Sequence, residues 1–230
     1  TFSRSKHALK NYLEITWRKD EMRLLRNQLS FMPDHDKARF RKALVVMLYS
    51  HYEGFAKAAF TVYINAVNRK HLMCSEATLP LAAATLAQAF KDYENPSRKA
   101  DEFRDLFPGD TELHRFGRQV WLLSTLDTLW EKEVAISAEQ LVDTEANLMP
   151  GVLRKMLFRL GFEYDAFRSH DGYIHRLLNH RNAIAHGLRK EGILEADYDE
   201  IESASFAILD GIRGLVIRQL ENDAFLKKPE

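Results

Sequence analysis

Hydrophobic residues recur every three or four positions along most of the 230-residue chain, which is the spacing of one face of an α-helix. No segment shows the sustained alternation of apolar and polar residues that indicates a half-buried β-strand. Residues that interrupt helices are scarce, since the chain has only ten glycines and six prolines. This pattern predicts an all-α fold.

The predicted helices differ in length. The strongest segment, 36–69, is expected to span about 50 Å, with Leu44, Leu48, Phe55 and Ala59 on one side. The other long or well-marked helices are predicted at 4–29, 151–160, 172–186 and 197–225. Residues 71–135 are predicted to form an insertion of shorter helices that completes and covers the core. The chain has no internal repeat and no Gly/Ser-rich linker, so we expect one domain over residues 1–230.

The composition limits what the protein binds and where it acts. With 33 basic and 33 acidic residues the formal net charge is zero, so an anionic partner must be bound by local cations. A single cysteine, Cys74, excludes an internal disulfide and fits a reducing compartment. The N-terminal residues lack the apolar core of a signal peptide, and no run approaches a membrane span. We therefore expect a cytoplasmic protein that does not contact the membrane.

One segment, RLLNHRNAIAHGLRK at 176–190, places polar residues inside an apolar helical pattern. Its apolar stripe consists of Ile174, Leu177, Leu178, Ile184, Ala185 and Leu188. Arg181 lies near the middle of this stripe, Asn182 and His186 stack four positions apart on its flank, and Gly187 marks the helix end. Spacing alone leaves a structural explanation open, in which Arg181 is ion-paired or extends along the surface and His186 caps the helix.

The segment RNAIAHG resembles the motif of the HEPN superfamily (higher eukaryotes and prokaryotes nucleotide-binding), whose ribonuclease members carry an arginine, a polar residue, several others and then a histidine. The stretches MLYSHYEGFAKAAFTVYINAVN and ANLMPGVLRKMLFRLGFEYDAF resemble the prokaryotic MAE-type branch. The three stretches cover most of the chain in the expected order, whereas residues 71–135 match no recognised pattern. The resemblance implies a HEPN-like helical bundle with long core helices.

The resemblance also implies an activity, that of a metal-independent RNA endonuclease without a cofactor. The sequence fits a metal-independent enzyme, since it has no CxxC, no HExxH and no carboxylate cluster that would hold a metal. Three histidines recur every five residues, which spreads them around a helix and makes them a poor set of metal ligands: His170, His175 and His180. The nucleophile would then be the 2′-hydroxyl of the substrate. His186 would move a proton, Arg181 would bind the scissile phosphate, and Asn182 would orient the phosphate or the histidine.

Members of the superfamily commonly form two-fold dimers whose motifs face each other, so the resemblance implies a homodimer with a shared site. Arg176, Arg189 and Lys190 would extend its RNA-binding surface, although each is as readily an ordinary solvated charge. The family association further suggests a toxin or phage-defence effector, for which an antitoxin protein is a candidate partner.

Two other functions stay open at this point. A catalytically silent HEPN module would bind RNA or nucleotide without cutting it, and a helical scaffold would use Arg181 only to pair with an acid. In segment 36–69, His51 is interpreted as a core histidine, and Glu53 and Lys57 as a solvated ion pair, although this stretch could add to the site.

Overall fold

The computed structural model describes residues 13–228, whose regular elements are all helical, so the predicted all-α fold is confirmed. In chain order the elements are α2 (Thr16–Asn27), η1 (Gln28–Phe31), α3 (Asp34–Asn68), α4 (Leu79–Thr85), α5 (Ala87–Glu94), η2 (Asp101–Phe103), α6 (Thr111–Trp130), α7 (Ala138–Leu141), α8 (Pro150–Arg159), η3 (Arg168–His170), α9 (Asp171–Ala185) and α10 (Glu195–Glu221). The η elements are single turns of 3-10 helix.

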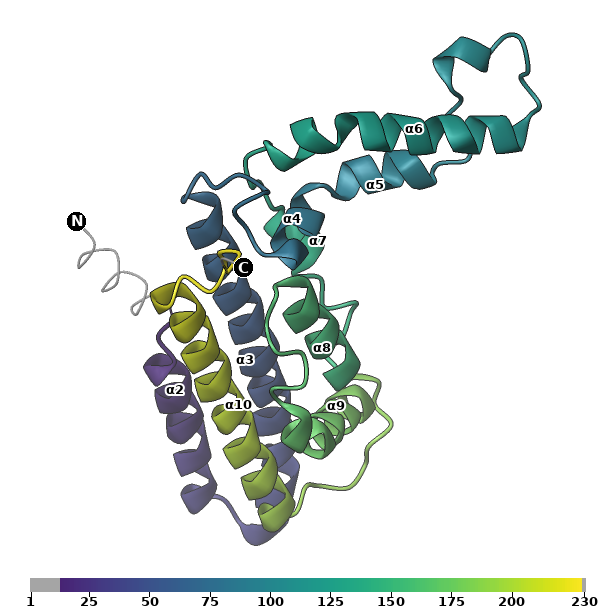
Figure 1. Ribbon diagram of the computed structural model, residues 1–230. Coiled ribbons are helices and arrows are strands. Elements are labelled where there is room, and N and C mark those ends of the chain that lie inside the picture. The colour runs from purple at the N-terminus through teal and green to yellow at the C-terminus, as the bar shows by residue number, and fades with distance from the viewer. Residues whose placement is uncertain (1–12, 229–230) are drawn as a thin grey trace.

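Helix α3 is the axis of the bundle, and α2, α9 and α10 pack against it (Figure 1). The extended residue Pro33 precedes its first turn, where Asp34 and Asp36 interact favourably with the positive end of the helix dipole. The helix has 35 residues, and one of its faces is buried from Arg41 to Val67. The prediction for 36–69 is thus confirmed to within two residues at each end.

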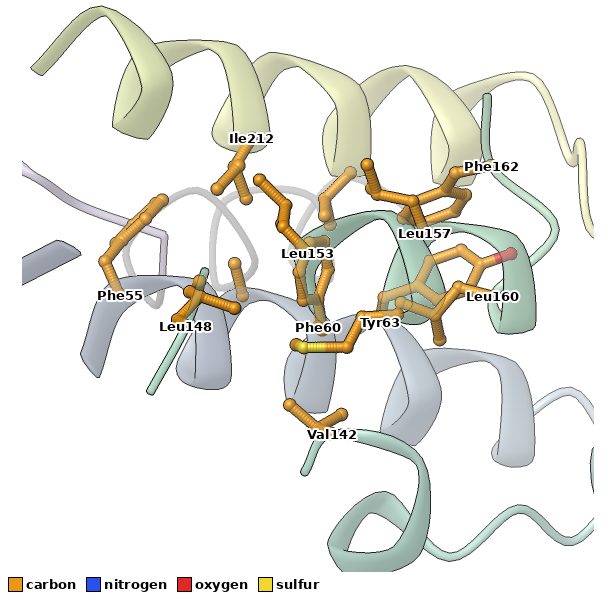
Figure 2. Close-up of a cluster of buried hydrophobic side chains, with 14 of the residues drawn as sticks. Phe55, Phe60, Tyr63, Val142, Leu148, Leu153, Leu157, Leu160, Phe162 and Ile212 are labelled. Atoms are coloured by element: carbon orange, nitrogen blue, oxygen red, sulfur yellow. The ribbon is translucent and has the colours of Figure 1, made fainter. Parts of the chain in front are cut away.

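The core lies between α3, α8 and α10, where large apolar side chains from all three helices meet (Figure 2). The rings of Phe60 and Tyr63 on α3 contact Phe162, with centroid distances of 6.1 and 4.6 Å. Leu153 from α8 and Ile212 from α10 fill the space beside them. Burying each such side chain contributes about 1.5–3 kcal/mol, so this cluster fixes α8 and the loop before it against α3.

Helices α5 and α6 leave the bundle as an antiparallel pair, which we call the arm (residues 87–130; Figure 1). This corrects the expectation that the inserted helices complete and cover the core. Helix α4 does so, with Leu81 and Ala82 buried, but the main packing partner of α6 is α5. The periodicity of α6 shows that one of its faces is apolar, but it does not show what that face contacts.

The remaining boundaries follow the prediction closely within the described residues. Helices α8 and α9 begin and end within one residue of the predicted segments, and α10 begins two residues before its predicted segment and ends four residues before its end. The predicted first helix, 4–29, falls partly on residues 1–12, which lie outside the described residues; in the described part this helix starts at Thr16 and ends at Asn27.

No helix between residues 13 and 228 is both long enough and apolar enough to cross a membrane.

Candidate active site

Helix α9 carries Arg181 and Asn182, and it ends at Ala185, just before His186 and Gly187. The position of Gly187 in the sequence predicts this end. Ile174, Leu177 and Leu178 are buried against the bundle, and Ile184 packs on the edge of the core. Gly187 has φ of +68°, and its N–H donates to the carbonyl of Ile184 at 3.0 Å. The next N–H, of Leu188, donates to the carbonyl of Ala183 at 2.8 Å, which completes a Schellman motif. Ala185 and Leu188 are exposed, so the prediction that they belong to the packed stripe is wrong, because the chain turns away here.

Replacing Gly187 with alanine is expected to lower the free energy of unfolding by about 1 kcal/mol, because a Cβ is strained at positive φ. Gly172→Ala is the matched control: it lies in the first turn of the same helix, and its added Cβ meets nothing within 4 Å. That change should be neutral or slightly stabilising. Chemical denaturation of both variants measures the difference, and equal midpoints would contradict the role of Gly187.

Arg181 is held in place by uncharged groups. Its guanidinium lies over the ring of Tyr49, 4.7 Å from the centroid, and its Nη1 donates to Oδ1 of Asn147 at 3.0 Å and Oδ1 of Asn182 at 2.8 Å. Its Nε and Nη2 have no hydrogen-bond partner within residues 13–228, and neither atom is buried. The side chain is therefore oriented by three neighbours while two donor atoms of its planar fork stay available to an anion.

The loop that supplies Asn147 is tied to α3 at both ends. The Thr144 hydroxyl donates to Oε1 of Glu53 at 2.6 Å, and the N–H of Leu148 donates to the hydroxyl of Tyr49 at 3.1 Å. Glu145 and Ala146 between these two contacts have positive φ angles of 49° and 71°. Few non-glycine residues adopt this conformation, so the loop follows an unusual path that places Asn147 against Arg181.

Burial and hydrogen bonding shift the two titratable groups behind Arg181 in opposite directions. Burial raises the pKa of Tyr49 to about 12, although the N–H of Leu148 and the charge of Arg181 oppose the shift. For Glu53, burial alone would raise the pKa, but hydrogen bonds from Thr144, Lys57 and Tyr49 outweigh it and the pKa is lowered. Glu53 is thus charged and Tyr49 neutral near pH 7, which leaves Tyr49 as an aromatic support for a cation.

His186 follows the last residue of α9 and is exposed, and its imidazole makes no hydrogen bond or ion pair with any described residue. Asn182 lies four positions earlier, so the two side chains stack on one flank of the helix as predicted. Arg181 and His186 are five positions apart, which separates their directions around the helix by about 140°. The structure therefore brings Arg181 together with Asn182 but not with His186 of the same chain.

The three outer cations predicted to help bind RNA have different surroundings. Arg176 donates to Asp197 at 3.1 Å and to Glu200 at 2.6 Å, and Arg189 donates to Nδ1 of His180 at 2.9 Å. A guanidinium can only donate, so the ring proton of His180 is on Nε2, which contacts Asp197 at 2.7 Å. Arg176 and Arg189 thus belong to an ion-pair network between α9 and α10. Lys190 is exposed and has no such partner among the described residues.

Residues 11–225 match the family model described as HEPN_MAE_28990-like HEPN. The chain belongs to this HEPN family. No curated protein and no solved structure matches the chain. Membership confirms the resemblance drawn from the three sequence stretches, and the match extends through the arm, which sequence inspection had left without an assignment.

Sequence reasoning missed two residues of this HEPN cluster, Tyr49 and Asn147. Both lie inside the stretches that carried the family resemblance, but neither is a residue type that signals chemistry by itself. They meet Arg181 only through the fold, because 132 and 34 positions of sequence separate them from it. The spacing of polar residues within α9 contains no signal that predicts either contact.

The sequence left open whether His51, Glu53 and Lys57 of α3 add to the site. The surroundings of His51 differ from those of the other two residues. His51 is buried and contacts Trp17 edge-on at 5.5 Å, and its Nε2 lies 3.1 Å from a carboxylate oxygen of Glu21, as a core histidine would. Burial lowers the pKa of His51. Lys57 and Glu53 form the predicted pair at 3.1 Å, but the side chain of Glu53 is only 18% exposed because it also holds the loop before α8.

Within residues 13–228 no three side chains of His, Cys, Asp or Glu come together in an arrangement that could hold a metal ion. His170 ends the turn before α9, and His175 and His180 lie five and ten residues further along, in the helix. Of the three, His180 alone has a hydrogen bond to a described residue of α10, and its ring is already occupied by Arg189 and Asp197.

Proposed function

We propose that this HEPN domain is an endoribonuclease that needs no metal ion or other cofactor. The observation that supports this most strongly is the state of Arg181: three uncharged neighbours orient its guanidinium, while Nε and Nη2 have no partner among the described residues. An arginine held in this way is suited to a phosphate, because no carboxylate competes for its fork. The exposed His186 at the end of the same helix supplies a group that can move protons.

The proposed reaction uses the substrate as its own nucleophile. The 2′-hydroxyl loses its proton and attacks the adjacent phosphorus, the bond from phosphorus to the 5′-oxygen breaks, and the 5′-oxygen takes up a proton. The products are a 2′,3′-cyclic phosphate and a 5′-hydroxyl, so the reaction needs no water or cofactor. His186 serves as the base or the acid, and Arg181 stabilises the additional negative charge of the pentacoordinate transition state.

The RNAIAHG segment of one chain offers only one arginine and one histidine, and their positions point to different sides of α9. The polar face of this helix consists of Gly172, His175, Asn179, Asn182 and His186, spaced three and four apart, and most of these residues are exposed. A second copy related by a two-fold axis would place its own His186 beside the first chain's Arg181. We therefore propose a homodimer in which the catalytic residues Arg181, Asn182 and His186 act in a shared cleft, with Lys190 at its edge. Arg176 and Arg189 would add only weak contacts, since acids or His180 already engage them.

The alternative of a helical scaffold fits the structure poorly. It requires Arg181 to pair with an acid, whereas Arg181 forms no ion pair with any described Asp or Glu. A toxin or phage-defence role and an antitoxin partner belong to the proposal on the strength of family membership alone. Action in the cytoplasm is proposed because the single cysteine fits a reducing compartment.

Incubation of the purified chain with RNA in EDTA tests the proposal. We expect cleavage that leaves cyclic phosphates, and we expect resistance of a substrate with one 2′-deoxy nucleotide 5′ to the cut, because its nucleophile is missing. RNA retention without cleavage would favour the catalytically silent module. Cleavage that depends on a metal ion, or cleavage of DNA, would contradict the proposed chemistry.

Asn147→Ala is expected to reduce cleavage about tenfold, because it removes one of the hydrogen bonds that orient Arg181, worth about 1.4 kcal/mol in the transition state. Asn222→Ala is the control, since Asn222 is exposed directly after α10, outside the polar face of α9, and has no hydrogen bond to Arg181. The ratio of the two kcat/KM values measures the effect. Equal values for both variants would show that Asn147 does not position Arg181.

A further inference from the structure

The side-chain amides of Asn147 and Asn182 have a defined orientation beside Arg181. Both accept a hydrogen bond from Nη1 of Arg181, at 3.0 and 2.8 Å. A guanidinium can only donate, so the oxygen of each amide, and not its nitrogen, must face the arginine. The Nδ2 atoms of Asn147 and Asn182 are therefore directed to other partners, and each carries two N–H donors.

These two Nδ2 atoms have no hydrogen-bond partner within residues 13–228. Both residues are half-buried, but neither Nδ2 atom is enclosed by the protein. Nε and Nη2 of Arg181 are in the same state. The two amide oxygens, which are the only side-chain acceptors of the three residues, already face the arginine. The cluster of Arg181, Asn147 and Asn182 thus presents donors to a ligand and almost no acceptor.

The backbone holds Asn147 at the site without help from Arg181. The N–H of Asn147 donates to the carbonyl of Thr144 at 2.9 Å, and its carbonyl accepts from the N–H of Met149 at 2.8 Å. Thr144 and Leu148 are buried, and both are hydrogen-bonded to α3. The loop therefore fixes the position of Asn147, and the arginine adds the orientation of its amide.

We propose that Asn147 binds RNA directly, by donating from Nδ2 to a non-bridging oxygen of the phosphate that Arg181 holds. The inference rests on the proposed function only in that RNA binds at Arg181. A phosphate suits a cluster of donors, because its charged oxygens accept several hydrogen bonds and bring no donor of their own. The edge of a base fits less well, since bases combine donors with acceptors.

The residue type at position 147 supports a contact with the substrate as well as with Arg181. If its only task were to hold the arginine, an aspartate would do so more strongly, because hydrogen bonds between charged groups are the stronger ones. An aspartate would also place a negative charge beside the phosphate and would offer no donor. Asn147 holds Arg181 through Oδ1, adds no charge and keeps two N–H donors for the anion.

A double-mutant cycle on binding separates this contact from a role in holding Arg181. The probe is a single-stranded RNA of mixed sequence with fluorine in place of every 2′-hydroxyl, which keeps its phosphates but has no nucleophile. The effect of Asn147→Ala on the Kd is measured in the unaltered chain and again in the Arg181→Ala background, at one fixed salt concentration. If Asn147 acts only through Arg181, its removal has no effect in the second background.

We expect Asn147→Ala to raise the Kd by about three- to tenfold in the Arg181→Ala background, the effect of one hydrogen bond. Asn222→Ala in the same background is the control and should leave the Kd unchanged, because Asn222 is exposed directly after α10. Chemical denaturation checks that both double variants are folded. A Kd that stays at the value of Arg181→Ala alone when Asn147→Ala is added would overturn the direct contact.

The outcome of this cycle is distinct from the outcome of the cleavage assay. If the unaltered chain cuts no RNA in EDTA but the expected effect remains in the Arg181→Ala background, the endoribonuclease fails and the Asn147 contact stands in a module that binds RNA. If RNA is cut but no effect remains, the endoribonuclease stands and Asn147 only positions Arg181.

Discussion

Replacing His186 with alanine is expected to reduce RNA cleavage by about 10²- to 10⁴-fold, the contribution of a positioned acid or base. The fold should be retained, because the imidazole is exposed and contacts no other described side chain through a hydrogen bond or ion pair. A residue in the cap of a helix contributes about 1 kcal/mol or less to stability. Single-turnover cleavage in EDTA measures the first effect, and chemical denaturation measures the second.

His71→Ala is the control for this experiment. His71 is also an exposed histidine, but it follows α3 and lies outside the polar face of α9. Its removal should leave cleavage within a few-fold of the unaltered chain. Wild-type cleavage by His186→Ala, or an equal loss in both variants, would remove His186 from the proposed mechanism.

Arg181→Ala is expected to reduce cleavage by about 10²- to 10³-fold, the effect of removing one donor to the charge that develops in the transition state. Arg181→Lys should restore little of this activity, because an ammonium group cannot present the planar fork that Tyr49, Asn147 and Asn182 hold in place. Both variants also lose the stacking over Tyr49, so the free energy of unfolding must be measured alongside the rate.

Arg159→Ala controls for the loss of a positive charge, since Arg159 is exposed at the end of α8 and forms no ion pair with a described residue. We expect its kcat/KM to remain close to that of the unaltered chain. If Arg181→Lys were as active as the unaltered chain, or if Arg159→Ala lost as much activity as Arg181→Ala, simple electrostatic attraction would replace oriented phosphate binding as the explanation.

The parts of the fold that sequence predicts are those governed by local pattern. Helix α3 is predicted to within two residues because its apolar positions repeat along most of its 35 residues and no proline lies within it. The end of α9 is predicted because glycine, here Gly187, adopts without strain the positive φ that the helix stop requires. The same end explains one error: Leu188 continues the apolar spacing in sequence, but after the stop it points into solvent.

The parts that sequence does not predict depend on contacts between distant segments. The apolar stripe of α6 has the same pattern as a core-facing helix, so spacing alone cannot show that the arm leaves the bundle. The arginine of the motif is visible in the sequence, but the neighbours that orient it, Tyr49 and Asn147, are brought to it only by the packing of α8 and α9 against α3. Sequence thus predicts the residues that we propose to carry the chemistry, and the fold defines how Arg181 is held.

The shared site is tested most directly by mixing two inactive variants, Arg181→Ala and His186→Ala, under conditions that allow subunits to exchange. In a mixed dimer one cleft keeps Arg181 from one copy and His186 from the other. If exchange is random, half of the dimers are mixed, and each has one complete site of two, so cleavage in EDTA should return to about a quarter of the unaltered rate. If the mixture is no more active than the sum of its two components, while mass measurements confirm mixed dimers, the shared RNA-cleaving site is contradicted.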